Sequence, residues 1–287
     1  MLFGHQKIWQ FLINSAQKDN LSHAFLFSGP EKVGKKTLAF HFIKWLFGKD
    51  GWKGNNHPDL VFIEPKGGEI QIEQIRELIW KISLCPIVAP LKAGIVDQAH
   101  LMNYQAQNCF LKTLEEPKGK AILILVTEFP ESLLPTISSR CQKIKFSLLK
   151  KEEMEKIVLK FKKDKKEIEE IIRITQGKPG LALELINHPE RLKEKKRIWR
   201  EIERLSKEDL AWRFQYAKKV YQSQKTEEFL DLWLTFFREK LLSSLDNDLQ
   251  KVKYFKNLLE KIQNTRILIS QTKVNPRLAL EVLMLDM

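Results

Sequence analysis

The chain has 287 residues, enough for two or three domains, and its hydrophobic fraction of 43% is ordinary for a globular protein. No apolar run approaches the roughly 20 residues that cross a bilayer, and the first residues lack the basic and apolar parts of a secretory signal, so we expect neither a membrane span nor secretion. The three cysteines, Cys85, Cys109 and Cys141, are too far apart for a disulfide framework or a C-x-x-C metal site, which indicates the reducing cytoplasm.

The net charge of +13 permits binding to nucleic acid, because phosphate contacts require lysine and arginine. Lysine-rich helices exposed to solvent would give the same charge, and Lys150–Glu155 and Lys160–Glu170 mix both signs as such helices do. We favour this second explanation, so the charge alone does not indicate a DNA-binding protein.

The first half of the chain alternates short apolar runs with amphipathic segments, which is typical of a parallel α/β sheet. The predicted strands are Ala24–Ser28, Leu60–Glu64, Ala93–Val96, Ala121–Val126 and Gln142–Phe146. The predicted helices are Lys35–Phe47, a segment around Ile72–Ile82, Leu101–Glu115 and a short helix within Pro130–Arg140.

Beyond about Leu148 the pattern predicts helices alone. Three short ones are expected at Lys151–Phe161, Lys165–Thr175 and Gly180–Ile186, and a second block at Glu190–Leu205, Lys207–Tyr221, Thr226–Leu245, Asp248–Thr272 and Pro276–Leu285. Aromatic residues at helical spacing in the second block indicate a core or a subunit interface. We therefore expect an α/β nucleotide-fold domain at 1–148, a helical lid at 149–187 and a helical domain at 188–287.

A phosphate-binding loop follows the first predicted strand. Gly29, Gly34 and Lys35 match the pattern Gly, four residues, Gly-Lys, but position 36, which should carry the hydroxyl that holds Mg²⁺, is a lysine. Backbone N–H groups and the helix N-terminus would hold phosphate, and Lys35 would reach its outer oxygens. Thr37 does not replace the hydroxyl, since one step along a helix turns the side chain by about 100°, and Lys36 would repel a metal ion. Binding of ATP or ADP stays open.

Asp97 and Gln98 follow the third predicted strand. In P-loop enzymes an aspartate at this place helps to hold Mg²⁺, and in many of them a glutamate comes next and activates water. An amide such as Gln98 cannot accept a proton at neutral pH, so this role is lost. Taken alone, Asp97 would also suit a helix cap. Together with Lys36, Gln98 predicts that the chain does not hydrolyse ATP.

Ser139, Arg140 and Cys141 follow a segment that ends in Pro-Thr-Ile-Ser. An arginine at a domain edge can stabilise charge on the phosphates of a neighbouring subunit, although a single arginine is more often a surface ion-pair partner. Glu115 and Glu116 end a predicted helix, where the macrodipole disfavours acids by roughly 0.3–1 kcal/mol each. They are either plain exposed residues or subunit contacts.

These segments resemble the delta-prime subunit family of the bacterial DNA polymerase III clamp loader, in the AAA+ superfamily. The likeness runs nearly from end to end of the chain, through His23–Pro30, His57–Leu60, Ile72–Arg76, Asn108–Pro117, Pro130–Cys141 and Asn275–Leu280.

The resemblance implies a subunit of a heteropentameric ring with gamma/tau-type ATPase subunits and a clamp-opening delta subunit. The ring loads the sliding clamp on primed DNA within a holoenzyme whose polymerase activity lies in another subunit. A delta-prime subunit looks like a stator without ATPase activity, which offers the arginine of its Ser-Arg-Cys motif in trans, here Arg140. Its C-terminal helical domain would join a collar that holds the ring together.

Two departures from the family pattern matter. Members often carry four zinc-binding cysteines after the P-loop, but Gly48–Pro58 has none, so we expect no zinc and no other metal. Gly180 stands where related ATPases place a sensor arginine, which removes a phosphate contact. One alternative is an active ATPase subunit of the same loader, which would want a hydroxyl at position 36 and a glutamate at 98. The other is a basic DNA-binding protein.

Overall fold

A computed structural model describes residues 4–18, 20–48, 52, 56–116, 119–161, 164–205, 208–245, 248–272 and 274–287. The chain forms two compact units, the first made of Met1–Ile157 with Gly177–Leu181 and the second of Val158–Gln176 with Ala182–Met287. The expected division into three domains stays a prediction. Within Gly48–Pro58, residues 49–51 and 53–55 lie outside the described residues. Pro117 and Lys207 lie outside them as well.

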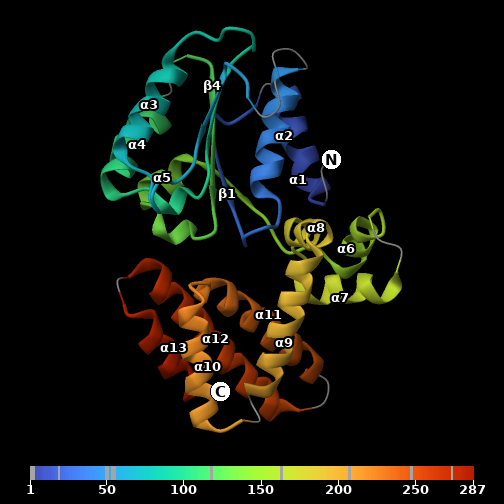
Figure 1. Cartoon of the computed structure of the whole chain (residues 1–287). Coiled ribbons are helices and arrows are strands. Elements are labelled where there is room, and N and C mark those ends of the chain that lie inside the picture. Colours follow the sequence, from blue (N-terminus) through green and yellow to red (C-terminus); the bar gives the residue numbers. More distant parts are fainter. Residues whose placement is uncertain are drawn as a thin grey trace. The chain divides into compact units, whose positions relative to one another are not determined.

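The first unit is built on a five-stranded parallel sheet with the order β2-β3-β4-β1-β5 (Figure 1). The strands are β1 (Ala24–Ser28), β2 (Leu60–Ile63), β3 (Lys92–Val96), β4 (Ala121–Thr127) and β5 (Gln142–Lys145). All five predicted strands are confirmed, to within one residue at each end. Because every pairing is parallel, the carboxyl ends of the strands share one edge of the sheet, where α/β proteins hold their ligands.

Helices cover both faces of this sheet (Figure 1). One face packs against α1 (Gln6–Gln17) and α2 (Lys35–Phe47), and the other against α3 (Ile72–Ser83), α4 (Tyr104–Glu115) and α5 (Pro135–Arg140). Each face of the sheet has its own hydrophobic core, and successive residues of β1 alternate between the two. Phe25 and Phe27 belong to the core under α1 and α2, and Leu26 belongs to the core under α3, α4 and α5. A strand buried on both faces needs a continuous apolar run, which is the pattern that predicted it.

The helices of the first unit differ from the predicted ones at three places. The helix expected from Leu101 begins at Tyr104, because the side chain of Asn103 accepts a hydrogen bond from the backbone N–H of Ala106 (2.8 Å) and caps it. Within Pro130–Arg140, a 3-10 turn precedes α5, which starts at Pro135. The helix α1 has no counterpart among the predicted elements.

The rest of the chain is helical, as expected. A short helix, α6 (Lys151–Val158), follows the sheet, and the others are α7 (Lys165–Thr175), α8 (Pro179–Asn187), α9 (Pro189–Leu205), α10 (Leu210–Gln222), α11 (Thr226–Ser244), α12 (Leu249–Gln271) and α13 (Pro276–Met284). In the second unit α11 packs on α12, and α10 packs on α13. No helix within the described ranges is long and apolar enough to cross a membrane.

The aromatic residues of these helices form much of the core of the second unit. Trp199, Tyr216, Trp233 and Phe236 are buried, as their helical spacing predicted, and Trp233 is fully inaccessible. Phe214 departs from this pattern, since 36% of its surface is exposed.

Candidate functional site

The degenerate P-loop joins β1 to α2 at the carboxyl edge of the sheet. Gly29 (φ 144°) and Gly34 (φ 105°) have positive backbone angles that favour glycine. A Cβ atom on Gly29 would lie 2.3 Å from the backbone oxygen of Phe146, just beyond β5. Apart from its neighbours along the chain, no described residue has an atom within 4 Å of a Cβ on Gly34. The packing of the sheet therefore requires Gly29 whether or not the loop holds phosphate.

Lys35 is held by the loop that it belongs to. Its Nζ donates hydrogen bonds to the backbone oxygens of Gly29 and Pro30, both at 2.6 Å, and only 6% of the residue is exposed. Burial lowers the pKa of this amine to about 8, against the opposing effect of nearby carboxylates such as Glu128. The ammonium group expected to reach phosphate is thus engaged by carbonyl groups of its own loop.

Lys36 lies against the acidic residue that ends β3. Its Nζ is 2.9 Å from Oδ2 of Asp97, 3.8 Å from Oε2 of Glu64 and 4.5 Å from the centre of the Phe62 ring. The residue that replaces the metal-binding hydroxyl therefore gives Asp97 an internal positive partner. This donor set does not fit Mg²⁺, because a cation stands in place of an oxygen ligand. The side chain of Thr37, the next residue, is exposed.

Asp97 also caps the turn that follows β3. Its Oδ1 accepts a hydrogen bond from the backbone N–H of Gln98 at 3.1 Å, and Gln98 has a left-handed backbone (φ 50°) and an exposed side chain. One carboxylate oxygen of Asp97 therefore contacts Lys36, and the other accepts the hydrogen bond from the turn. Gln98 offers no base beside it.

Two buried polar residues of the first unit were not found by sequence reasoning. Thr127, at the carboxyl end of β4, is fully buried and shares a 3.1 Å hydrogen bond with Nδ1 of His100. Gln107 of α4 is buried, and its Oε1 accepts a hydrogen bond from the backbone N–H of Leu134 (2.8 Å), directly before α5. The rule that strand ends share an edge would have identified Thr127, whereas Gln107 is a helix residue with no motif around it.

Gly180 packs directly on the P-loop. Its N–H donates to the backbone oxygen of Lys32 at 2.8 Å, and a Cβ atom on Gly180 would lie 2.8 Å from that oxygen. Any larger residue, arginine included, would have to push the two segments apart.

Arg140 ends α5, and its guanidinium group makes two contacts. Its Nη1 donates to the backbone oxygen of Thr136 at 2.9 Å, and its Nη2 pairs with Oε1 of Glu115, the last residue of α4. The side chain of Arg140 is 35% exposed. Arg140 is thus an accessible cation held by two neighbours.

The two residues beside Arg140 have structural contacts. Ser139 donates its hydroxyl hydrogen to the backbone oxygen of Thr136 at 3.1 Å. Cys141 is buried, and burial raises the pKa of its thiol to about 12, which leaves it protonated and unreactive at neutral pH.

The strand register places Arg140 and the P-loop at opposite edges of the sheet. Gln142, at the start of β5, pairs with Phe25 near the start of β1, whereas Lys145 at its end pairs with Ser28, directly before the loop. Arg140 precedes β5, so about 13 Å of strand separates the two edges. The structure therefore does not bring Arg140 close to the P-loop of the same chain.

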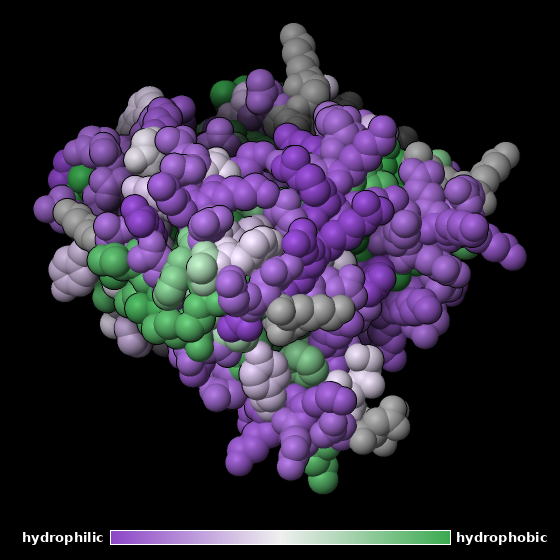
Figure 2. All heavy atoms as spheres, turned by 60° about the horizontal axis from the view of Figure 1, so that its bottom comes forward, coloured by the Kyte–Doolittle hydropathy of each residue, from purple (hydrophilic) through white to green (hydrophobic). Residues whose placement is uncertain are grey.

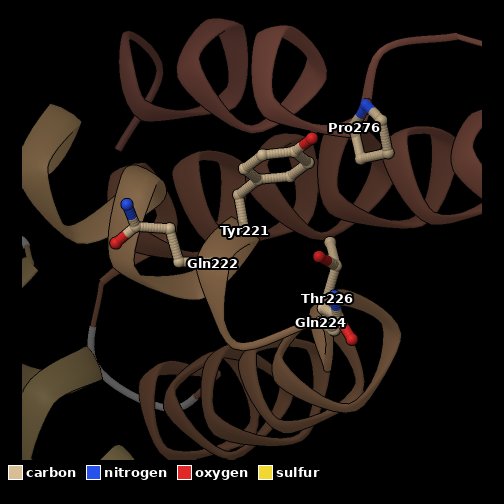
Figure 3. Close-up of a pocket in the computed structure, with 5 residues that line it drawn as sticks. All are labelled: Tyr221, Gln222, Gln224, Thr226 and Pro276. Atoms are coloured by element: carbon tan, nitrogen blue, oxygen red, sulfur yellow. The ribbon is translucent and has the colours of Figure 1, made fainter.

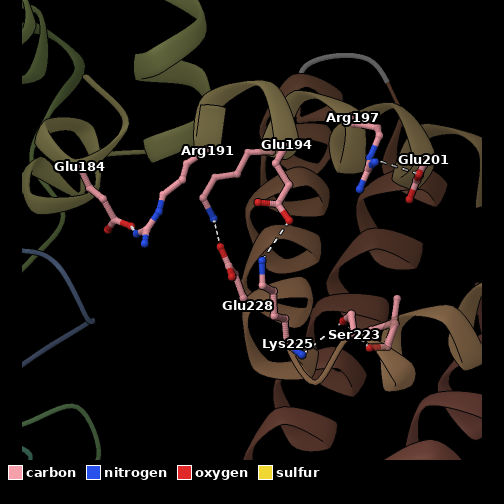
Figure 4. Close-up of polar contacts among 10 residues, drawn as sticks. Glu184, Arg191, Glu194, Arg197, Glu201, Ser223, Lys225 and Glu228 are labelled. Carbon is pink, nitrogen blue, oxygen red and sulfur yellow. Dashed lines mark hydrogen bonds and ion pairs between the residues drawn. The ribbon is translucent and has the colours of Figure 1, made fainter. Parts of the chain in front are cut away.

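Many charged side chains of the second unit form ion pairs with one another. Lys195 pairs with Glu228 at 2.7 Å and Lys225 with Glu194 at 3.1 Å (Figure 4). Further pairs join Arg191 to Glu184, Arg197 to Glu201, Lys219 to Glu201 and Lys196 to Glu170. This mixture of signs is that of solvated helices rather than of a uniform phosphate-binding surface.

A pocket of about 320 Å³ lies in the second unit, between the end of α10 and the start of α13 (Figure 3). Its lining residues are Tyr221, Gln222, Gln224, Thr226 and Pro276. None of these described residues carries a charge, so they offer no cation that would recognise phosphate. Among the residues that the structure describes, no three His, Cys, Asp or Glu side chains gather closely enough to hold a metal ion.

Comparison with known proteins gives consistent results. A family model described as "DNA polymerase III, delta subunit" matches residues 4–150. The DNA polymerase III subunit delta′ of Bacillus subtilis is 30% identical over 280 residues, 92% of this chain and 80% of that protein. The same subunit of Pseudomonas aeruginosa is 34% identical over 152 residues, 47% of this chain and 45% of that protein.

Among solved structures, a DNA polymerase III gamma subunit-related protein from Thermotoga maritima has the same fold. Its TM-score is 0.55 at 20% identity, over 96% of this chain and 97% of that one.

Proposed function

The chain belongs to the delta′ family of DNA polymerase III subunits, and from this premise we propose that it is the non-hydrolysing stator subunit of a clamp loader. The ion pair between Lys36 and Asp97 carries the proposal, because it puts an internal cation on the carboxylate that would otherwise help to hold Mg²⁺. Gln98 supplies no base for the attacking water. ATP hydrolysis in the loader then takes place in other subunits, while this one supports the ring that places the sliding clamp on primed DNA.

Arg140 acts in trans in this proposal. It lies at the amino edge of the sheet, away from the P-loop of its own chain, and it is accessible at the end of α5. A guanidinium group in this position suits the phosphates of a nucleotide held by an adjacent gamma/tau-type ATPase subunit, where it stabilises the charge of the transition state. Ser139 and Cys141 shape the turn that presents it.

The helical C-terminal part joins the collar of a heteropentamer that also contains the delta subunit. Six apolar side chains of α10, of α13 and of the residue that directly follows α13 are 36% to 62% exposed: Leu210, Phe214, Tyr221, Leu278, Val282 and Leu285. Figure 2 shows hydrophobic residues gathered on the side of the second unit where α13 lies. Exposed apolar surface on two packed helices is typical of a protein interface, and helices of the neighbouring loader subunits are the occupants that we propose. Clamp and primer-template DNA are contacted through the assembled complex.

The proposal is tested by rebuilding the loader, with ATPase and delta subunits from the same organism, around the Arg140→Ala variant. Loss of an arginine finger costs about 10³- to 10⁵-fold at the site it serves, so we expect the ATP turnover stimulated by clamp and DNA to lose the contribution of that site. Arg76→Ala, which removes an exposed arginine of α3, is the matched control. Unchanged turnover with Arg140→Ala would refute the role.

The purified chain alone is the second arm of this test. We expect no Mg²⁺-dependent ATP hydrolysis. Hydrolysis that is abolished by Lys35→Ala would instead identify an active ATPase subunit. Tight, salt-sensitive binding of the isolated chain to DNA would favour a plain DNA-binding protein.

A further inference from the structure

Glu115 is an acid in a position that a helix by itself disfavours. It is the last residue of α4, where the negative end of the helix macrodipole repels a carboxylate. Arg140 compensates for this, since its Nη2 pairs with Oε1 of Glu115. The side chains are 35% and 47% exposed, and ion pairs this accessible contribute little to the stability of a fold. Stability therefore gives no sufficient reason for the pair.

The pair has a clear geometric effect on Arg140. A guanidinium group has five N–H donors in a rigid, planar arrangement. Here one nitrogen donates to the backbone oxygen of Thr136 (2.9 Å), within α5, and another pairs with Glu115 from α4. Two anchors from two helices define the plane of the group and use only part of its donors. Within the described part of the chain, no further hydrogen bond or ion pair uses the remaining donors, so they stay available to a partner.

We propose that Glu115 is a positioning residue, which holds the guanidinium group of Arg140 in the orientation that meets the phosphates of the neighbouring subunit's nucleotide. This rests on the proposed role of Arg140 in trans. A long, flexible side chain loses conformational entropy when it is fixed in a complex. Anchoring it in the free subunit removes that cost from the step in which the ring reaches its active geometry. Glu115 acts through Arg140 and does not itself touch the nucleotide.

The test compares variants in the rebuilt loader. Glu115→Ala is expected to lower kcat for ATP by about 2- to 10-fold, the range expected for immobilising one rotamer-rich side chain, with little change in KM. Glu115→Gln keeps an acceptor oxygen and should retain most of the rate. The double variant with Arg140→Ala should be no slower than Arg140→Ala alone, because one residue acts only through the other. Glu116→Ala, at the exposed adjacent residue, is the control.

A second measurement reports on Arg140 in the isolated full-length chain. In the Glu115→Ala variant, the Nε–H group of Arg140 should become more mobile by ¹⁵N relaxation, and thermal unfolding should show that the fold is retained. A faster loader with Glu115→Ala would mean that the pair restrains Arg140, and would overturn the inference.

An unchanged kcat with Glu115→Ala would overturn the inference as well, while a loss with Arg140→Ala would leave the proposed function standing. An additional loss in the double variant would point to a structural role of Glu115 instead. If Arg140→Ala itself had no effect, the proposed function and this inference would both fail.

Discussion

Lys36 is the clearest departure from the P-loop pattern, because it stands where that pattern has Ser or Thr. The sequence predicted that it would repel a metal ion, and the structure adds that its ammonium group lies 2.9 Å from Asp97. This contact could not be identified from the motifs alone, because it joins the first turn of α2 to the end of β3. The substitution therefore does more than remove a ligand, since it occupies the carboxylate that a metal would need.

Replacing Lys36 by threonine should restore one part of the lost site. In Lys36→Thr, Asp97 loses its internal partner and the missing hydroxyl returns. We expect Mg²⁺ to strengthen ATP binding by about tenfold, the size of one interaction with a charged group, and to have no such effect on the natural protein. Gln98 still offers no base, so hydrolysis stays absent.

Isothermal titration calorimetry with ATP, with and without Mg²⁺, measures this effect. Lys36→Met is the control, since it removes the charge without adding an oxygen ligand. The explanation fails if Mg²⁺ strengthens ATP binding equally in the natural protein and in Lys36→Thr.

The elements of the first unit were largely predictable, and the reason is physical. Strands buried on both faces are continuous apolar runs, so β1 and β4 stand out from the sequence. The pairing of Arg140 with Glu115 was not predictable, because it depends on how α5 packs beside α4. The buried Gln107 helps to set that packing, through the hydrogen bond from Leu134, yet no motif marks it. The motifs thus identified candidate residues such as Arg140, but not the contacts that hold their side chains.

Asp59 joins β2 to the segment before β3 and makes the sheet sensitive to acid. It is fully buried, pairs with the buried Lys92 at 2.8 Å, and accepts hydrogen bonds from the backbone N–H groups of Ile87, Val88 and Ala89. Burial by itself would raise the pKa of this carboxyl, but the hydrogen bonds and Lys92 outweigh it and hold the pKa well below its ordinary value.

Asp59→Asn should therefore destabilise the first unit by about 3–5 kcal/mol at pH 7, because Lys92 is left buried without a counter-charge. Because the pKa of Asp59 is lower in the folded than in the unfolded state, its charge increases the free energy of unfolding at pH values above the unfolded pKa, near 4. This contribution is lost as the pH falls toward the pKa of the folded state. The difference between the natural protein and Asp59→Asn should thus shrink below about pH 4.

Urea unfolding at pH 7 and pH 3.5 measures this difference. Glu69→Gln, at an exposed acid of the same unit, should show no comparable loss. An equal loss at both pH values would contradict the assigned role of the Asp59 charge.

At the scale of the whole molecule, the chain combines a sheet domain in which Lys36 is paired with Asp97 and helices that have an exposed apolar surface. If α10 and α13 join the collar, a charge placed on that surface should prevent assembly without unfolding the chain. Val282 is 62% exposed, so Val282→Glu costs the isolated protein little, whereas burying the new carboxylate against a neighbouring subunit is strongly unfavourable.

We therefore expect Val282→Glu to weaken co-purification with the ATPase and delta subunits by at least about tenfold, a loss of roughly 1.4 kcal/mol. Leu249→Glu is the matched control, because Leu249 is 85% exposed at the start of α12 and outside the α10 and α13 surface. Size-exclusion chromatography with light scattering would measure assembly, and circular dichroism would verify the fold. A full complex with Val282→Glu would place the ring contacts on other helices of this unit, while leaving the role of Arg140 to be judged by turnover.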